Sequence, residues 1–287
     1  MEPRIGLALG GGGARALAHL GALIALEEAQ IPICCIAGSS MGAAIGASKA
    51  IGADLKKIES LLGCLDLNDL LQVSDSTLRE VQRVLGRGVM EYVRGSTWRE
   101  EDAKPQDLAR LYELFSLLTA NKSFDDVLTP FAVIATDVET GERVTLDRGK
   151  LYHAVTASAA VPGVFSPVAW EGRFLVDGGI VEKLPVTAVI EMGATAIIAV
   201  DAGAQPGRRA VETRLDALLQ TQRTTSQHLT QHQLERARER VGGRIIVIRP
   251  EVAWITMFGF EHTEEAIQAG KDSIQAHLDQ IRELVEG

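Results

Sequence analysis

The first 51 residues contain the pattern that most restricts the fold of this chain: two apolar segments, each followed by a glycine-containing turn and a helical pattern. The first apolar segment, 5–9, leads through 10–13 into a helical pattern at 14–29. The second, 33–37, leads into a helical pattern at 40–51. Strands that alternate with helices in this way favour a parallel sheet covered by helices. We therefore expect an α/β fold.

The remainder of the chain contains further strand and helix patterns and one long helical segment. Residues 54–126 have a mostly helical pattern and are predicted to form an insertion that caps a cleft. No repeat or linker is visible, so a single domain over 1–287 is the simplest organisation. Further strand patterns lie at 131–136, 143–146, 173–176, 196–200 and 244–248, and further helical patterns at 154–160, 211–241 and 263–285.

Composition excludes several classes of protein. The chain is 46% hydrophobic and carries a net charge of -9, which argues against a general nucleic-acid-binding protein. Its cysteines, Cys34, Cys35 and Cys64, have neither the spacing of a disulfide framework nor that of a metal site. With no signal peptide and no uninterrupted apolar run at the N-terminus, we expect a cytoplasmic protein. The oligomeric state is not predicted by any of these features.

Residues 38–42 read G-S-S-M-G, which places Ser40 at the centre of G-x-S-x-G, between the second strand and the second helical pattern. A nucleophile elbow requires this context, because a tight strand-to-helix turn lifts the serine above the sheet edge. Gly38 and Gly42 are expected where strand and helix approach too closely for larger side chains. The motif by itself is weak, so its position between strand and helix carries the prediction. Ser39 does not fit the spacing and is expected to be a turn residue.

The glycines at 10–13 lie between the first strand and the first helix, where their N–H groups can converge on one concavity. A dinucleotide-binding fingerprint fits Gly11-x-Gly13-x-x-Ala16, but the acidic residue required at the end of the second strand is missing. A Walker loop is excluded because no Gly-Lys-Ser/Thr follows. An oxyanion hole remains, beside the alternative that the glycines only permit close packing. His19, further along the helix, is expected to be a packing residue.

The base that would activate Ser40 has two candidates. Elbow hydrolases usually supply an acid and then a histidine later in the chain, and His262 fits that order. Asp177 is the stronger candidate, because it ends an apolar strand and precedes two glycines, a turn that can aim its carboxylate at the sheet edge near Ser40. Capping a turn is the alternative role for this aspartate. His228 and His232 lie on a polar helical pattern and are expected at the surface.

Several segments together resemble those of the bacterial patatin-like phospholipase family. They read LALGGGGARALAHLGAL, IAGSSMGAAIGA, ATDVETGE, ASAAVPGVFSPV and VDGGIVEKLPV, occur in the family's order, and cover most of the chain outside the insertion. The resemblance implies a three-layer α/β/α sandwich with a mostly parallel central sheet. It also implies hydrolysis of lipid acyl esters by a Ser–Asp dyad that needs no histidine, metal or cofactor.

Carried over to this sequence, the resemblance implies that Ser40 is the nucleophile and Asp177 its base. It further implies that the oxyanion hole is built from Gly11, Gly12, Gly13 and Arg15. The substrate would be an acyl ester of a phospholipid or lysophospholipid, reached through transient peripheral membrane contact. The apolar residues of the insertion are expected mostly in the core, with some able to shield an acyl chain: Leu61, Leu62, Leu65, Leu70, Leu71, Leu111, Leu114, Phe115, Leu117 and Leu118.

The sequence departs from the family pattern at two places. Ala16 stands where glycine is usual, a change that a helix tolerates, and Glu182-Lys183 stand where asparagines are frequent before Leu-Pro. The second departure is expected to alter the rim of the site and the substrate. Two alternatives to a lipid hydrolase stay open: a Ser–Asp–His esterase on small substrates that uses His262, and a non-catalytic regulatory or adaptor protein on the same scaffold.

Overall fold

A computed structural model describes residues 3–67, 106–162, 164–203 and 214–287. In these residues one mixed sheet has the strand order β5-β6-β3-β2-β1-β7-β8, and β4 also pairs with β3. The central pairs β3-β2, β2-β1, β1-β7 and β7-β8 are parallel, and the pairs around β4, β5 and β6 are antiparallel. The strands are β1 (Ile5–Leu9), β2 (Cys35–Ser39), β3 (Phe131–Asp137), β4 (Arg143–Leu146), β5 (Val168–Trp170), β6 (Arg173–Asp177), β7 (Ala196–Val200) and β8 (Ile245–Ile248).

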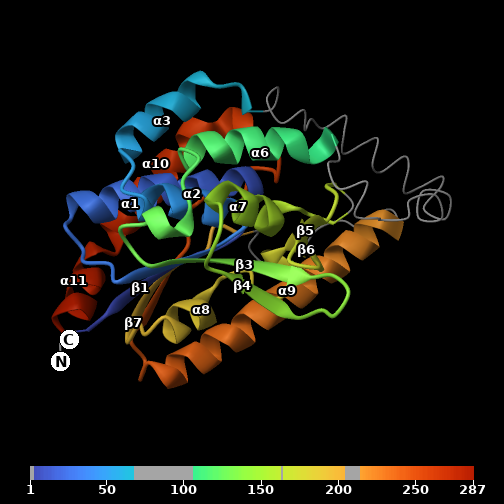
Figure 1. The fold of residues 1–287 in the computed structure, drawn as a ribbon. Helices are drawn as coiled ribbons and strands as arrows, with labels where there is room; N and C mark the ends of the chain where they lie inside the picture. The colour runs from blue at the N-terminus through green and yellow to red at the C-terminus, as the bar shows by residue number, and fades with distance from the viewer. Residues whose placement is uncertain (1–2, 68–105, 163, 204–213) are drawn as a thin grey trace.

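Helices cover both faces of this sheet, which makes three layers (Figure 1). Helices α8 and α9 lie on one face, where they enclose a smaller core, while α1, α2, α3, α6, α7 and α10 lie on the other, over the larger core. Strands β1, β2, β3 and β7 are buried along their whole length, which explains their continuous apolar sequences. The α/β/α sandwich predicted from the sequence is therefore confirmed.

The described helices have these bounds: η1 (Gly13–Leu17), α1 (Ala18–Glu28), α2 (Met41–Ala50), α3 (Leu55–Cys64), α6 (Gln106–Leu118), η3 (Phe124–Asp126), α7 (Leu151–Ala159), η4 (Gly178–Ile180), α8 (Val186–Glu191), α9 (Arg214–Arg240), η5 (Phe260–His262), α10 (Thr263–Ala276) and α11 (Leu278–Glu286). Those labelled η are short 3-10 helices.

Strand β3 brings the ends of β2 and β6 together. Strand β4 occupies one edge of β3 along Val133 to Thr136. Strand β2 pairs with β3 up to Ile134, and β6 pairs with it from Ala135 onward, so β2 and β6 lie end to end along the opposite edge of β3. Ser39, the last residue of β2, pairs with Ile134, and Asp177, the last residue of β6, pairs with the next residue, Ala135. Since β6 runs antiparallel to β3, its end meets the carboxyl end of β2. The register therefore places Asp177 beside Ser40.

Most predicted elements begin and end within three residues of their observed bounds. Strand β5 and helix α8 were not predicted, and the expected helix at 263–285 is broken. At the break His277 leaves helical geometry, and its ring lies 2.8 Å from the carbonyl oxygen of Ser273. The single-domain organisation stays a prediction.

The apolar residues expected in the helical insertion fall into three groups. Those at the surface are Leu61 and Leu117, and Leu65 is partly buried. Leu70 and Leu71 lie outside the described residues. The others pack in the core, as expected for most of them: Leu62, Leu111, Leu114, Phe115 and Leu118.

Candidate active site

Ser40 occupies a strained turn between β2 and α2. Its backbone has φ +54° and ψ -130°, a conformation that side-chain-bearing residues rarely adopt. The carbonyl oxygen of Ser40 accepts the N–H of Ala43 at 2.9 Å, so the residue caps the start of α2. The side chain is buried to 7% exposure. This geometry is that of a serine held at a helix N-terminus, where the dipole favours negative charge.

The two glycines of the motif lie where backbones touch. A Cβ at Gly38 would stand 2.4 Å from the Cα of Ala43, and a Cβ at Gly42 would stand 2.4 Å from the carbonyl oxygen of Leu9. Both separations are far shorter than any real contact of a Cβ. Strand, loop and helix therefore meet around Ser40 in a way that only glycine at these two positions permits.

Ser158 of α7 fixes the backbone of Ser40. The Oγ of Ser158 accepts the Ser40 N–H at 2.7 Å and donates to the Ile134 carbonyl at 2.5 Å. Ser158 is fully buried, so these bonds are made without competition from water. Ser158 lies in a segment that resembles the family, but the sequence assigns it no role. The sequence of α7 gives no distinct signal for this role, because the helix also contains the polar residues His153 and Thr156.

Asp177 forms a buried hydrogen bond with the side chain of Ser40. The carboxylate also accepts the N–H of Gly179 at 2.7 Å, while the Asp177 N–H donates to the Ala160 carbonyl at 3.0 Å. Burial raises the pKa of Asp177 from 3.8 to about 6, although the two hydrogen bonds and the charge of Lys183 act against this rise. The aspartate thus caps the turn at η4 and also faces the serine. Its carboxylate is a better base than an exposed one, because its conjugate acid is weaker.

The glycine loop lies directly beside this pair. A Cβ at Gly11 would stand 3.3 Å from the Cβ of Ser40. The N–H groups of Gly10 and Gly11 are engaged, because they donate to Val200 and Lys183 carbonyls at 3.0 Å each. In the part of the chain that the structure describes, the N–H groups of Gly12 and Gly13 donate to no protein acceptor.

Three further contacts hold the loop in place. Gly13 has φ +61°, and a Cβ there would stand 2.3 Å from the Met257 carbonyl oxygen. His19, expected to be a packing residue, is fully buried, and its Nε2 lies 2.7 Å from the Gly10 carbonyl oxygen. Burial lowers the pKa of His19 to about 4, so the ring is neutral and its Nε2–H donates to that carbonyl. Arg15 donates from Nη1 to the Ile255 carbonyl at 3.2 Å.

The structure separates the two residues expected to alter the rim of the site. Glu182 is fully buried, where it pairs with Arg143 at 2.7 Å and accepts the Thr187 N–H at 2.7 Å. It serves the packing of α8 and does not belong to the rim, so the sequence interpretation is wrong for this residue. Lys183, in contrast, is close enough to act on the charge of Asp177.

His262 lies in a different environment. Its Nδ1 is 3.4 Å from Glu265, and its ring packs edge-on against Trp254 with centroids 4.7 Å apart. Among the described residues, no hydrogen bond joins His262 to Ser40 or Asp177. His228 and His232 are exposed on α9. The residue that meets Ser40 is therefore the aspartate.

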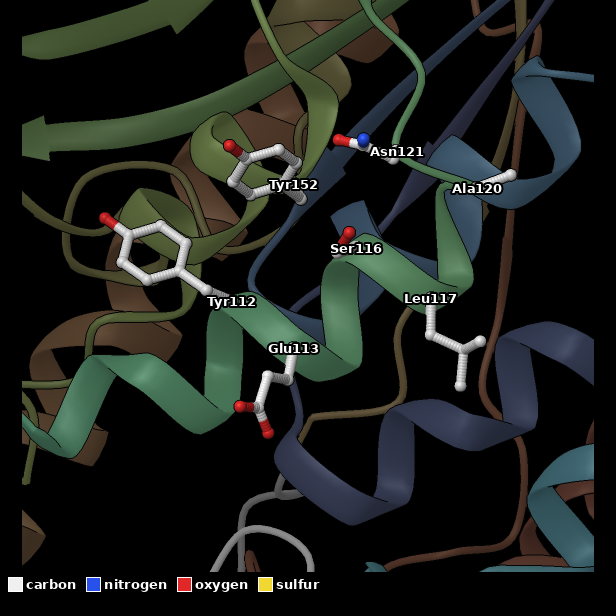
Figure 2. A pocket seen from close by; sticks show the side chains of 7 residues that line it. All are labelled: Tyr112, Glu113, Ser116, Leu117, Ala120, Asn121 and Tyr152. Carbon is white, nitrogen blue, oxygen red and sulfur yellow. The ribbon is translucent and has the colours of Figure 1, made fainter.

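A groove of about 730 Å³ lies apart from this site, on α6 and the start of α7 (Figure 2). Tyr112 and Tyr152 meet there edge-to-face with ring centroids 5.9 Å apart, and the exposed Leu117 lies further along α6. Neither Ser40 nor Asp177 lines it.

Two kinds of feature are absent from the described residues. None of their helices has the length and apolarity needed to cross a membrane. Within the same ranges, no three His, Cys, Asp or Glu side chains are grouped to hold a metal ion.

Comparison with known sequences gives the same family. The sequence pattern of the patatin-like phospholipases matches residues 7–190. An uncharacterized NTE family protein of Mycobacterium tuberculosis is 32% identical over 199 residues, which cover 69% of this chain and 49% of that protein. Lysophospholipase NTE1 of Mycosarcoma maydis is 32% identical over 211 residues, which cover 69% of this chain and 10% of that protein.

The fold is shared with VipD from Legionella pneumophila, with a TM-score of 0.54 at 18% identity over 97% of this chain and 67% of VipD. The mycobacterial and fungal relatives named above are longer than this chain, which spans about half of their length or less. The matched segment includes the glycine loop, the elbow and Asp177, and it covers well over half of the chain. The chain therefore belongs to the patatin-like phospholipase family.

Proposed function

We propose that this protein is a serine acyl hydrolase that cleaves acyl esters of phospholipids or lysophospholipids through a Ser40–Asp177 dyad. The observation that carries the proposal is the strand register that brings buried Asp177 against Ser40, and burial there raises the pKa of Asp177 to about 6. A base of this strength is ionised at neutral pH and is still able to accept a proton. In this proposal His262 takes no part in the reaction.

In the first half of the reaction, Ser40 Oγ attacks the acyl carbonyl carbon while Asp177 takes the hydroxyl proton. The carbonyl oxygen becomes an oxyanion, and the N–H groups of Gly12 and Gly13 are the donors proposed to bind it. A single donor of this kind contributes roughly 3 kcal/mol to transition-state stabilisation in known enzymes. Asp177 then passes its proton to the leaving alcohol, which leaves an acyl group on Ser40.

In the second half, Asp177 removes a proton from water, whose oxygen attacks the acyl-enzyme. The same oxyanion site stabilises the second tetrahedral intermediate, and the proton returns to Ser40 as the fatty acid departs. The chain's own residues supply every proton transfer in this scheme.

The substrate class follows from family membership and from the name lysophospholipase carried by relatives such as the Mycosarcoma maydis protein. Because this chain spans only part of those proteins, their activity is a proposal for this one. Substrate would be taken from a membrane or a micelle by transient peripheral contact, and the cytoplasmic location stays a prediction. The alternative of a small-ester esterase differs in needing His262.

Steady-state hydrolysis of acyl esters tests the proposal. Chain length and headgroup are varied for the wild type and for the Ser40→Ala, Asp177→Ala and His262→Ala variants. We expect the first two variants to lose at least about 1,000-fold in kcat, because each removes part of one catalytic unit. The His262→Ala variant is the matched control and should retain activity. Full activity in Asp177→Ala would refute the dyad, and loss of activity in His262→Ala would favour the triad.

A further inference from the structure

Lys183 places a cation next to the proposed dyad. Its carbonyl oxygen accepts the Gly11 N–H at 3.0 Å, which ties the residue to the glycine loop. Its side chain then passes Gly179, where an added Cβ would stand 3.8 Å from the Lys183 Cγ. It ends over Gly203, where an added Cβ would stand only 1.9 Å from Nζ. The ammonium therefore lies at the sheet edge, between the turn after Asp177 and the segment after β7.

The acids near this ammonium are already engaged by other groups. Asp201 accepts the Gly203 N–H at 3.1 Å and lies 3.5 Å from the Arg249 Nε. Asp177 is bound by Ser40 and Gly179. Within residues 3–67, 106–162, 164–203 and 214–287, Lys183 Nζ forms no hydrogen bond and no ion pair within 4.0 Å.

The ammonium of Lys183 has no direct hydrogen-bond or ion-pair partner among the described residues, although charged groups act on it. Burial lowers the pKa of Lys183, the charge of Asp201 opposes this most strongly, Arg15 acts in the same direction as burial, and Asp177 acts against it. A partly buried ammonium with three unused donors is costly unless a ligand binds it. A charge-assisted hydrogen bond from an anionic oxygen would supply that partner.

We propose that Lys183 binds the phosphate of the substrate headgroup and so selects phosphate-bearing esters over neutral ones. This inference rests on the proposed function, since it concerns the substrate of the same site. In a glycerophospholipid the phosphate is separated from the acyl ester by the glycerol carbons, so a cation beside the dyad lies within reach of it. Of the two adjacent residues Glu182 and Lys183, which depart from the family pattern, Lys183 is the one that faces the site.

The test compares two substrates with the same acyl chain, lysophosphatidylglycerol and monoacylglycerol, in mixed micelles at fixed ionic strength. Lys183→Gln should lower the ratio of the two kcat/KM values by about 10- to 100-fold, the usual effect of losing one hydrogen bond to a charged group. Most of the loss should lie in KM for the phosphate-bearing substrate. Lys183→Arg should keep most of the ratio, and Lys57→Gln, on the exposed face of α3, is the matched surface control. Inorganic phosphate should inhibit the wild type more strongly than Lys183→Gln.

Three results are informative in different ways. An unchanged ratio in Lys183→Gln would overturn the inference and leave the proposed function intact. An equal loss on both substrates, with an acid limb of the pH profile that shifts on both, would mean that Lys183 acts through Asp177 and would also overturn it. A wild type that hydrolyses neither ester would refute the proposed function itself.

Discussion

Replacing Asp177 with asparagine should abolish activity and at the same time make the folded protein more stable at neutral pH. Asparagine has the shape of the neutral acid and keeps an acceptor for the Gly179 N–H. It cannot take a proton from Ser40, so hydrolysis should stop. It also carries no charge, so the free-energy cost of burying a carboxylate in the folded state disappears.

The size of this stabilisation follows from the pKa of Asp177, which is about 6 in the folded protein and 3.8 when unperturbed. Between pH 3.8 and about pH 6, the folded state binds more protons at Asp177 than the unfolded state does. The free energy of unfolding therefore falls as the pH rises through this range. At about 1.4 kcal/mol per pKa unit, the cost is about 3 kcal/mol at pH 8 and about 1 kcal/mol at pH 4.5. Asp177→Asn should recover those amounts.

Urea unfolding of wild type and variant at both pH values measures this difference. Asp137→Asn is the control, because the pKa of Asp137 is shifted in the opposite direction. Burial acts to raise this pKa, but hydrogen bonds from Glu139 and Thr140 and the charge of Arg173 outweigh burial and lower it. That substitution should therefore destabilise the protein at pH 8. A variant Asp177→Asn that is less stable than wild type at pH 8, or equally affected at both pH values, would refute the reasoning.

Other predictions concern the groups around the dyad. In Ser158→Ala the buried Ser40 N–H loses its acceptor. The free energy of unfolding should therefore fall by about 1–3 kcal/mol and kcat by at least about 10-fold. Unchanged kinetics would show that Ser158 is not needed to keep Ser40 in its turn conformation. Arg143→Ala leaves the carboxylate of Glu182 buried without its ion pair, which should cost about 3 kcal/mol in urea unfolding with kcat retained in the folded fraction. The acid limb of kcat/KM should rise through about pH 6, because Asp177 must be ionised; a limb near 4 would contradict its burial.

The parts of the site that lie within one continuous segment could be predicted from the sequence. The elbow around Ser40 and the glycine loop are each a strand, a turn and a helix, and local patterns define such units well. Asp177 was proposed from its position at a strand end and from the family resemblance. That it meets Ser40 depends on the register in which β2 and β6 share one edge of β3, which no local pattern determines.

Other features could not be predicted because they depend on tertiary contacts or on very short segments. Strand β5 spans three residues and α8 six, which are too short for periodicity to define. Ser158 reaches Ser40 across 118 positions in the sequence. Glu182 and Lys183 are neighbours in the chain but point into different surroundings, so the expectation that both line the rim is wrong for Glu182, while Lys183 lies close to Asp177. Only the folded structure shows that Glu182 forms a buried ion pair whereas Lys183 lies beside the dyad.

The most direct test of the central claim is to locate the adduct of a fluorophosphonate probe by peptide mass spectrometry. The proposed mechanism predicts one adduct on Ser40 in the wild type, formed with a rate that rises through about pH 6 as Asp177 ionises. Ser40→Ala should acquire no adduct and should lose ester hydrolysis. A folded wild type that shows no adduct, or a Ser40→Ala variant that still hydrolyses lipid esters, would contradict the assignment of Ser40 as the nucleophile.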